Sequence, residues 1–357
     1  MVSLTQLQIQ GLRNLDTTDL HLDPGFNLFE GSNGSGKTSI LESVFLLSRG
    51  RSFRTRDIRR VIADDADQLI VSALVQEQER KHRLGFQRSA SSARFRLDGK
   101  ELRSLSELVS HLPARFIGPD VHQLVSGLPA IRRSFMDWGL FHVKPQSHSV
   151  MMDFRKTLKQ RNAALQRNER LEVIRSLDPL FIQYAETLIS LREQHVSALK
   201  RFWPKEIIDC LGFDEIQIEM RSGIPNGATL KEALKMRLDK DRNQGFTNYG
   251  PHRGDVMIRI HNRTGKGRLS RGQEKLVAIG LLLAQSALLQ QERNRSAIFL
   301  LDDLASELDS DSQASVITSA KQQKAQFLIT TLPGRQAPLG EEQVKRFHVE
   351  QGCITPH

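Results

Sequence analysis

Hydrophobic and polar residues alternate in several short stretches of the chain, which is the pattern of half-buried strands. The first stretch contains Leu4 and Ile9, and the turn Asp23-Pro24-Gly25 leads to a second one from Phe26 to Phe29. LIVSALV, HRLGF and ARFRLDG, between residues 69 and 99, follow as three more. Because successive side chains of a strand point to opposite faces, the sequence predicts a mixed sheet at the N-terminus and then an antiparallel meander.

Other stretches repeat hydrophobic residues every three or four positions, the spacing of one helix face. SILESVFLLSRG, which ends at Gly50, is such a stretch, and helical sequence starts again at about residue 104. The longest helical region runs from Met151 to Trp203. We expect it to break at Asp178-Pro179, because the residue before a proline avoids the helical conformation. This region is therefore predicted to be a helical hairpin.

Strand patterns return in the last third of the chain. They are DVMIRIHN (255–262), AIFLLDDL, QFLITT and a final hairpin RFHVEQGCIT that turns at Gln351-Gly352, with a helix beginning in LSRGQ. Strands at both ends and helices in the middle predict an α/β core built from both ends, with a helical insertion. We place the core at 1–105 and 246–357, and the insertion at 106–245.

Composition narrows the class of protein. With 357 residues, of which 39% are hydrophobic, the chain can bury a sizeable core. The chain does not open with a basic segment followed by an apolar one, and no stretch approaches 18 uncharged apolar residues, so we expect a cytoplasmic protein that does not enter a membrane. Cys210 and Cys353 lie far apart with no His or Cys at ligand spacing, which argues against a disulfide framework or a zinc site.

Basic residues exceed acidic ones by 51 to 41, a net charge of +10, which favours a polyanionic partner such as DNA. The excess is concentrated between Phe154 and Arg175, on one predicted helix. The basic residues there are Arg155, Lys156, Lys159, Arg161, Arg167, Arg170 and Arg175. The candidate DNA contacts are the part of this stripe from Arg155 to Arg170, together with Arg132 and Arg133, although each could equally belong to a solvated helix face. Contacts to phosphate would make DNA binding fall steeply with salt.

A glycine-rich loop separates the predicted strand that ends at Phe29 from the helix that ends at Gly50. It matches G-x-x-x-x-G-K-[ST] and consists of Gly31, Ser32, Asn33, Gly34, Ser35, Gly36, Lys37 and Thr38. In such a loop the backbone amides surround nucleotide phosphates at a helix N-terminus. Lys37 would reach the β- and γ-phosphates of ATP, and Thr38 would bind Mg²⁺. A plain turn with a helix cap is the alternative.

Two adjacent carboxylates follow the apolar strand AIFLL. Burying both without a cation would cost several kcal/mol, so Asp302 is the candidate ligand of Mg²⁺, directly or through water. Asp303 is the candidate to orient an attacking water or to accept its proton. The alternative is a surface turn after a core strand.

The stretch LSRGQ opens a long apolar helix with Ser270, Arg271, Gly272 and Gln273. Ser270 and Gln273 have the spacing of a capping box, so a well-made helix start is the simplest reading. However, Gly272 leaves the first turn open, and the exposed amides form an anion site. A second phosphate-binding turn in one chain suggests a nucleotide held between Lys37 of one copy and Ser270, Arg271 and Gly272 of another.

These motifs resemble known families. LSRGQ resembles the LSGGQ signature of ABC-type ATPases, and SELD, from Ser306 to Asp309, resembles their D-loop. Blocks over nearly the whole chain resemble the RecF family: GLRNLDTTDLHLDPGFNLFEGSNGSGKTSILESVFLLSRGRSFR, FIGPDVHQLVSGLPAIRRSFMDWG, LKQRNAAL and YGPHRGDV. The resemblance implies an α/β, ABC-type P-loop ATPase head with a mixed sheet, related to SMC heads but without their long coiled coils. It also implies a mainly helical second lobe.

The resemblance also implies a function. It implies ATP-driven homodimerisation on single-stranded, duplex or junction DNA, with slow, DNA-stimulated ATP hydrolysis as a timer for release. It implies work in recombinational repair, replication-fork maintenance and SOS induction, together with RecO and RecR, to bring the recombinase RecA to gaps. A DNA-binding scaffold in which ATP hydrolysis is incidental is the alternative. The ATPase subunit of a membrane transporter is disfavoured by the helical insertion and the basic charge.

Some positions depart from the family patterns. Most ABC-type ATPases carry Glu at the position of Asp303. The side chain of Asp303 is shorter, which suits slow turnover. No His follows QFLITT where transporter ATPases have a switch histidine, which leaves Thr330 or Thr331 as substitutes. Gly254 stands where the RecF family commonly has Asp, and we assign it no role. The neighbouring His252 suits a functional or a structural histidine equally.

Overall fold

The computed structural model describes residues 1–357 except 214–215, 261–262, 265–266, 304–307, 335–338 and 340–343, and of residues 263–264 it describes the backbone alone. The chain forms two compact units. The first unit comprises residues 1–122, 204–211 and 271–357, and the second comprises residues 123–203 and 212–270. None of the described helices has the length and apolar character that crossing a bilayer requires.

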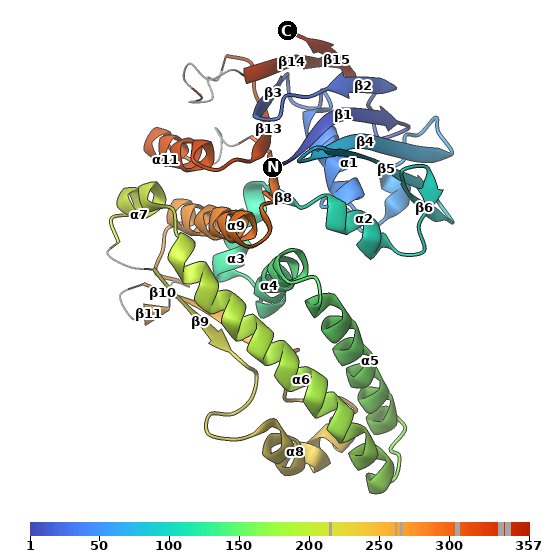
Figure 1. The fold of residues 1–357 in the computed structure, drawn as a ribbon, viewed down its shortest axis with the longest axis vertical. Coiled ribbons are helices and arrows are strands. Elements are labelled where there is room, and N and C mark those ends of the chain that lie inside the picture. Colours follow the sequence, from blue (N-terminus) through green and yellow to red (C-terminus); the bar gives the residue numbers. More distant parts are fainter. Residues whose placement is uncertain (214–215, 261–262, 265–266, 304–307, 335–338, 340–343) are drawn as a thin grey trace. The chain divides into compact units, whose positions relative to one another are not determined.

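A mostly parallel sheet forms the centre of the first unit (Figure 1). Its strands are β3 (Phe26–Glu30), β8 (Ala114–Ile117), β12 (Ile298–Leu301), β13 (Gln326–Thr331), β14 (Val344–Glu350) and β15 (Cys353–Pro356). The order is β15-β14-β3-β13-β12-β8, and only β15 runs antiparallel to its neighbour. Every residue of β12 and β13 is buried, as expected for strands covered on both faces. The predicted last hairpin is confirmed, with positive φ at Gln351 and Gly352.

An antiparallel sheet makes a second layer of the first unit. Its strands are β1 (Val2–Gln10), β2 (Thr18–His21), β4 (Gln68–Glu77), β5 (Arg80–Ser89), β6 (Ala93–Leu97) and β7 (Lys100–Glu101). Their order is β2-β1-β4-β5-β6-β7, which confirms the predicted meander. The predicted mixed sheet is present and contains β3 and the antiparallel strand β15, but β1 belongs to the antiparallel sheet instead. The helix α1 (Lys37–Arg49) packs its apolar side chains against both sheets in one core.

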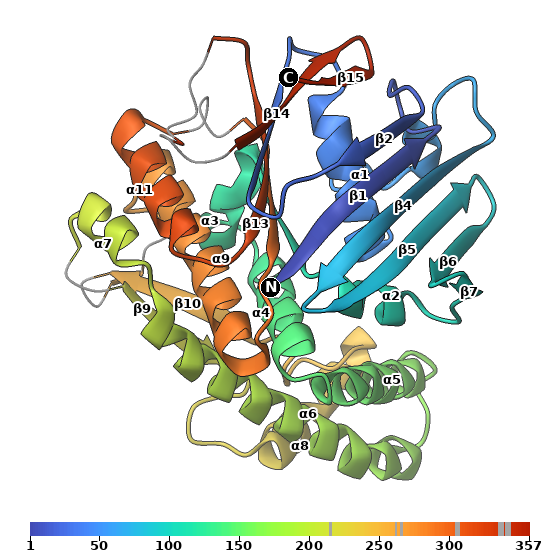
Figure 2. The ribbon, with the colours of Figure 1, turned by 45° about the horizontal axis from the view of Figure 1, so that its top comes forward.

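Further helices of the first unit lie within its described residues. They are α2 (Leu105–His111), α7 (Lys205–Leu211), α9 (Arg271–Arg293) and α11 (Ser310–Lys321), with 3-10 turns at Ile58–Arg60 and Pro119–His122. The helices α9 and α11 lie on the face of the parallel sheet opposite α1 (Figures 1 and 2). Both faces of that sheet are therefore covered, and its accessible parts are the ends of its strands.

The second unit is mainly helical. Its helices are α3 (Gln123–Ser126), α4 (Pro129–Val143), α5 (Ser147–Gln166), α6 (Leu171–Leu199) and α8 (Leu230–Gln244), with a 3-10 turn at Lys200–Phe202. Its small antiparallel sheet has the order β11-β10-β9, from β9 (Ile216–Arg221), β10 (Asp255–Ile260) and β11 (Arg263–Thr264). The strand β9 was not predicted from the sequence.

The observed units have other boundaries than the predicted segments 1–105, 106–245 and 246–357. Two strand pairings account for the difference. The strand β8, which was not predicted, pairs in parallel with β12 and so extends the first unit to residue 122. The strand β10 pairs with β9, which keeps the chain in the second unit up to residue 270.

The predicted hairpin of two long helices is confirmed, but its predicted break at Asp178-Pro179 is wrong. The helix α6 continues through Pro179, and the chain turns instead between α5 and α6. Two contacts account for this. The Asp178 carboxylate accepts a hydrogen bond from Arg161 of α5 at 2.8 Å, and Phe181, one turn further, is fully buried. Tertiary packing therefore outweighs the local cost of proline.

Some arginines predicted to contact DNA are buried in ion pairs of the second unit. The Arg161 side chain is fully buried and donates to Asp178 and, at 3.0 Å, to Asp241. Arg132 is 7% exposed and forms a two-fold pair with Asp255, at 2.8 and 2.9 Å. Arg161 and Arg132 are therefore removed from the predicted DNA contacts, because the helix pattern does not reveal which basic side chains face inward.

The surroundings of His252 and Gly254 give both residues a structural role. Nε2 of His252 donates to the carbonyl of Thr247 at 2.9 Å, and burial lowers the pKa of His252 to about 4. A Cβ at Gly254 would lie 2.7 Å from the carbonyl oxygen of Arg221. His252 is thus a half-buried, neutral histidine at the entry to β10, and the close approach of two backbone segments accounts for glycine at 254.

Candidate nucleotide-binding site

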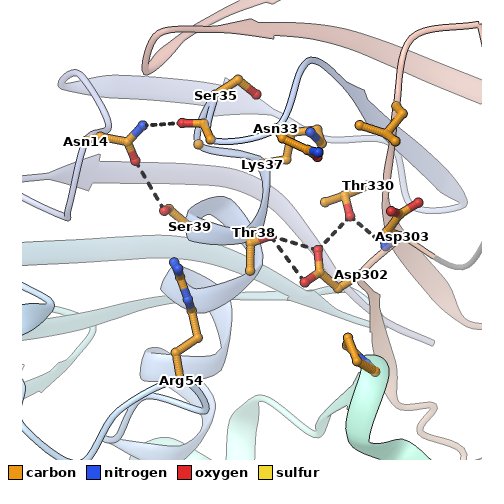
Figure 3. Close-up of a pocket in the computed structure, with 14 residues that line it drawn as sticks. Asn14, Asn33, Ser35, Lys37, Thr38, Ser39, Arg54, Asp302, Asp303 and Thr330 are labelled. Carbon is orange, nitrogen blue, oxygen red and sulfur yellow. Dashed lines mark hydrogen bonds between the residues drawn. The ribbon is translucent and has the colours of Figure 1, made fainter. Parts of the chain in front are cut away.

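The glycine-rich loop and the acidic pair meet at one edge of the parallel sheet. Because β3, β12 and β13 run parallel, their carboxyl ends lie at the same edge, where α/β proteins commonly bind ligands. The loop follows β3, Asp302 follows β12, and Thr330 lies near the end of β13 (Figure 3). The fold thus brings together motifs that are far apart in the sequence.

The path of the loop depends on glycine at two positions. Gly36, the N-cap of α1, has a φ of 115°, in the left-handed region that other residues rarely adopt. A Cβ at Gly31 would lie 2.2 Å from the carbonyl oxygen of Val349. These glycines let the loop enter the first turn of α1 directly, where exposed amides and the helix dipole favour an anion.

Lys37 begins α1, and its side chain folds back over the loop. Nζ donates to the carbonyls of Gly31, at 2.6 Å, and Ser32, at 2.7 Å. Burial lowers the pKa of Lys37, while the nearby carboxylates of Asp303 and Asp302 oppose this effect. The amine is therefore placed at the loop beside acidic groups, as a phosphate ligand with its counter-charges would require.

The Thr38 hydroxyl faces Asp302. It donates to the two carboxylate oxygens, at 2.9 and 3.2 Å. Hydroxyl and carboxylate oxygens are ligands that Mg²⁺ prefers, so the pair fits this ion. No group of three or more His, Cys, Asp or Glu among the described residues could hold a metal alone. Phosphate oxygens and water would have to complete the coordination of Mg²⁺.

Thr330 fixes both acidic residues. Its hydroxyl donates to Asp302 at 2.8 Å and accepts from the amide of Asp303 at 2.9 Å. Asp303 has a φ of 47°, a left-handed conformation that costs on the order of 1–2 kcal/mol in a residue with a side chain. Of the two threonines considered from the sequence, Thr330 lines the cavity, whereas Thr331 accepts from the Gly31 amide at 3.3 Å through its carbonyl.

A cavity of about 320 Å³ lies in front of these groups (Figure 3). Its lining comprises Asn14, Asn33, Gly34, Ser35, Gly36, Lys37, Thr38, Ser39, Arg54, Pro119, Asp302, Asp303, Thr330 and Leu332. Asn14 donates to the carbonyl of Gly34 at 3.0 Å, and Arg54 approaches the buried Glu42 at 3.8 Å. Asn14 and Arg54 were missed because neither belongs to a short chemical motif. Their only signal is that both lie within the first block that resembles the RecF family.

The signature residues are not part of this lining. Arg271 and Gly272 begin α9 and are exposed, Gln273 follows them, and the exposed Ser270 precedes them. The capping box of Ser270 with Gln273 stays a prediction. Of the predicted D-loop, Ser306 and Glu307 lie outside the described residues. Asp309 accepts from the Ser312 amide at 2.8 Å as the N-cap of α11.

Comparison with known proteins gives the family. The family described as "RecF/RecN/SMC N terminal domain" matches residues 3–355. "DNA replication and repair protein RecF" of Escherichia coli O1:K1 / APEC is 33% identical over 356 residues, which cover 99% of this chain and 100% of the relative. The chain belongs to the RecF family. RecF of Escherichia coli strain K12 / DH10B matches equally well.

Solved structures agree on the fold of this RecF-family member. The structure described as the recombination mediator protein RecF-ATP in the RecFOR pathway has a TM-score of 0.88 at 24% identity, over 100% of this chain and 99% of the other. The RecF-ATPrS structure has a TM-score of 0.85, also at 24% identity, over 99% of this chain and 98% of the other. An Smc head domain from Pyrococcus furiosus has a TM-score of 0.59 at 14% identity, over 100% of this chain and 96% of the other. The predicted ABC-type head with a helical portion, of the SMC and RecF type, is thus confirmed.

Proposed function

We propose that this RecF-family protein is an ATP-dependent DNA-binding protein of recombinational repair and replication that hydrolyses ATP slowly. One observation carries the proposal: Lys37, Thr38, Asp302 and Asp303 line a single cavity at a phosphate-binding loop. The loop and the family support ATP as the ligand. The direct test is titration of the protein with ATP and Mg²⁺ by calorimetry, and failure to bind would contradict the proposal.

Each residue has a role in the proposed reaction. The loop amides and Lys37 bind the β- and γ-phosphates, and Thr38 with Asp302 holds Mg²⁺, which when bound supplies positive charge to the phosphate oxygens. Asp303 orients a water and accepts its proton while the new bond to the γ-phosphorus forms and the bond to the oxygen of the departing ADP breaks. The short side chain of Asp303 suits slow turnover.

The variant Asp303→Asn tests hydrolysis separately from binding. The amide keeps the size of the side chain but is a poor base, so we expect hydrolysis to fall by about 100-fold or more with little change in ATP affinity. Repair of DNA damage should fail with it. Normal repair with no hydrolysis would favour the alternative function, a DNA-binding scaffold in which turnover is incidental.

We propose further that two copies share each nucleotide. Ser270, Arg271 and Gly272 are exposed at the start of a 23-residue helix, whose N-terminus favours an anion. In the proposed homodimer they meet the γ-phosphate bound by Lys37 of the partner. Light scattering with ATP and Mg²⁺ should show dimers of the wild type and monomers of Ser270→Arg. The ATPase rate should rise with the square of the protein concentration, and a rate per molecule independent of concentration would exclude a shared site.

The exposed part of the basic stripe on α5 is the proposed DNA contact. Its exposed members are Arg155, Lys156 and Lys159 on α5, and Arg167 and Arg170 in the turn that follows it. Charged side chains on one helix suit contacts to phosphate, which position DNA without reading its sequence. The dissociation constant should therefore rise steeply with salt and vary little with sequence. A constant unaffected by salt would remove the electrostatic basis of this contact.

The remaining functions rest on the family resemblance. They are cooperation with RecR and RecO, delivery of RecA to gaps, maintenance of replication forks and SOS induction in the cytoplasm. A pull-down of purified RecR and RecO with this protein, with and without ATP and gapped DNA, tests the partnership. Absence of either protein from the complex under all four conditions would contradict it.

A further inference from the structure

The antiparallel sheet of the first unit has a solvent face that none of the motifs uses. Figure 2 looks onto this sheet, with β4, β5 and β6 side by side. Its inner face is apolar, with Leu84 and Phe86 of β5 buried and Phe86 stacked on Phe95 of β6. The residues between them point outward. The register places Arg96 beside Gly85, and Arg94 beside Gln87.

This outer face belongs to a strongly basic segment of the chain. Residues 80–100 contain seven Lys or Arg and one acidic residue. Arg83, Arg94 and Arg96 are exposed, and none of them lies within 4 Å of a carboxylate among the described residues. The one acidic residue, Asp98, already accepts from the Arg83 amide at 2.7 Å and contacts His82 at 2.9 Å. Glu101 of β7 stands opposite Arg96 in the register, and the charge of Arg83 acts on Asp19 of β2, but the face keeps an excess of positive charge outside close ion pairs.

A cavity of about 240 Å³ lies between these arginines. Its lining is Ile70, Ser72, Arg83, Leu84, Gly85, Phe86, Gln87, Arg94, Arg96 and Gly99. Gly85 opens it, since a side chain there would extend beside Arg96, whose Cβ would lie 3.5 Å from a Cβ at 85. The surface therefore combines an apolar depression with guanidinium groups around it.

We propose that this face, the β5–β6 face, binds single-stranded DNA, with its arginines on phosphates and one base in the cavity. The inference rests on the proposed function as a DNA-binding protein and adds a site distinct from α5. A single strand offers both phosphates and unstacked bases, and proteins bind it through a basic groove combined with surfaces that cover the bases. A duplex keeps its bases stacked inside, so it can use the arginines but not the cavity. Arg94 and Arg96 are two residues apart on β6, so their backbones lie about 6.6 Å from one another. The sheet therefore fixes the spacing of these two arginines before DNA binds.

Fluorescence anisotropy with a labelled oligothymidine and a duplex of equal length tests the charges. We expect Arg94→Ala with Arg96→Ala to raise the dissociation constant for the single strand at least 10-fold and to reduce the slope of its logarithm against log salt by about 1.4, or 0.7 for each lost phosphate contact. The matched control Arg293→Ala with Lys324→Ala removes two exposed charges elsewhere in the first unit and should leave both values unchanged. An equal effect of the two double variants, or no effect of the first, overturns the site.

Gly85→Leu tests the cavity without changing charge. It should weaken binding of the single strand at least 5-fold and change duplex binding less than 2-fold, whereas Gly85→Ala should resemble the wild type. An unchanged melting temperature shows that Gly85→Leu is folded. Binding of oligothymidine by folded Gly85→Leu as tightly as by the wild type would exclude a base in the cavity. If the wild type binds neither the single strand nor the duplex, the proposed function itself fails. If the wild type binds DNA and the arginine variants bind it equally well, only the β5–β6 face is excluded.

Discussion

The Thr330 hydroxyl donates to Asp302 at 2.8 Å and accepts from the amide of Asp303 at 2.9 Å, so one side chain links the candidate Mg²⁺ ligand to the candidate base. Thr330→Val keeps the shape but removes both hydrogen bonds. Each is worth about 1 kcal/mol, and the loss should displace the two carboxylates. We therefore expect the hydrolysis rate to fall at least 10-fold while the dissociation constant for ATP changes less than 3-fold, as measured by steady-state kinetics and calorimetry.

The control for this prediction is Thr330→Ser. It retains a hydroxyl that can make the same two hydrogen bonds, so its rate should stay within about 3-fold of the wild type. If the serine variant is as slow as the valine variant, a hydroxyl at this position is not sufficient for hydrolysis and the proposed linkage is wrong.

Lys37 should contribute mainly to nucleotide affinity. Lys37→Met keeps an unbranched side chain of similar length and removes the charge. A hydrogen bond to a charged group contributes about 1.5–3 kcal/mol, so ATP should bind roughly 10- to 150-fold more weakly. Calorimetry measures the affinity, and light scattering should show no ATP-dependent dimer. ATP binding within 3-fold of the wild type would mean that the lysine side chain, bonded to Gly31 and Ser32, only supports the loop.

The sequence was sufficient for the parts of the site that lie in contiguous motifs. The loop from Gly31 to Thr38 and the pair Asp302 and Asp303 were predicted because glycine, lysine and carboxylates at these spacings have a direct chemical reason. Asn14 and Arg54 were not predicted, because their place in the cavity depends on how separate loops pack. The same limit applies to β8, whose identity as a strand depends on its pairing with β12.

Surface charge was the weakest part of the sequence interpretation. Helical spacing grouped Arg161 with Arg155, but the fold buries Arg161 completely and leaves Arg155 exposed. In addition, the basic segment from 80 to 100 was not predicted to contact DNA, because its arginines alternate along strands and only the pairing of β5 with β6 gathers them on one face. A count of charges along the chain cannot replace the register of the sheet.

Partial burial of His252 makes the stability of the protein depend on pH. Its folded pKa of about 4 lies below the ordinary value near 6.5, so the unfolded chain takes up the proton first as the pH falls. The stability is fully present above about pH 6.5 and is lost between 6.5 and 4. The test measures the free energy of unfolding in urea at pH 7 and at pH 4.5. Between these two values it should fall by about 2–3 kcal/mol less in His252→Gln than in the wild type. Equal losses in both proteins would assign the pH dependence to other groups.

The pairing of Arg161 with Asp178 and Asp241 predicts that this arginine stabilises the fold and does not bind DNA. Arg161→Leu would leave the fully buried Asp241 without its cation, a change that typically costs about 3–5 kcal/mol. Arg155→Leu, on the exposed side of the same helix, should change stability by less than about 0.5 kcal/mol. Urea unfolding measures both, and anisotropy measures DNA affinity. The assignment requires that Arg155→Leu weakens DNA binding without loss of stability. A stable Arg161→Leu protein with impaired DNA binding would reverse the two roles, because it would mean that the arginine leaves its carboxylates to meet phosphate.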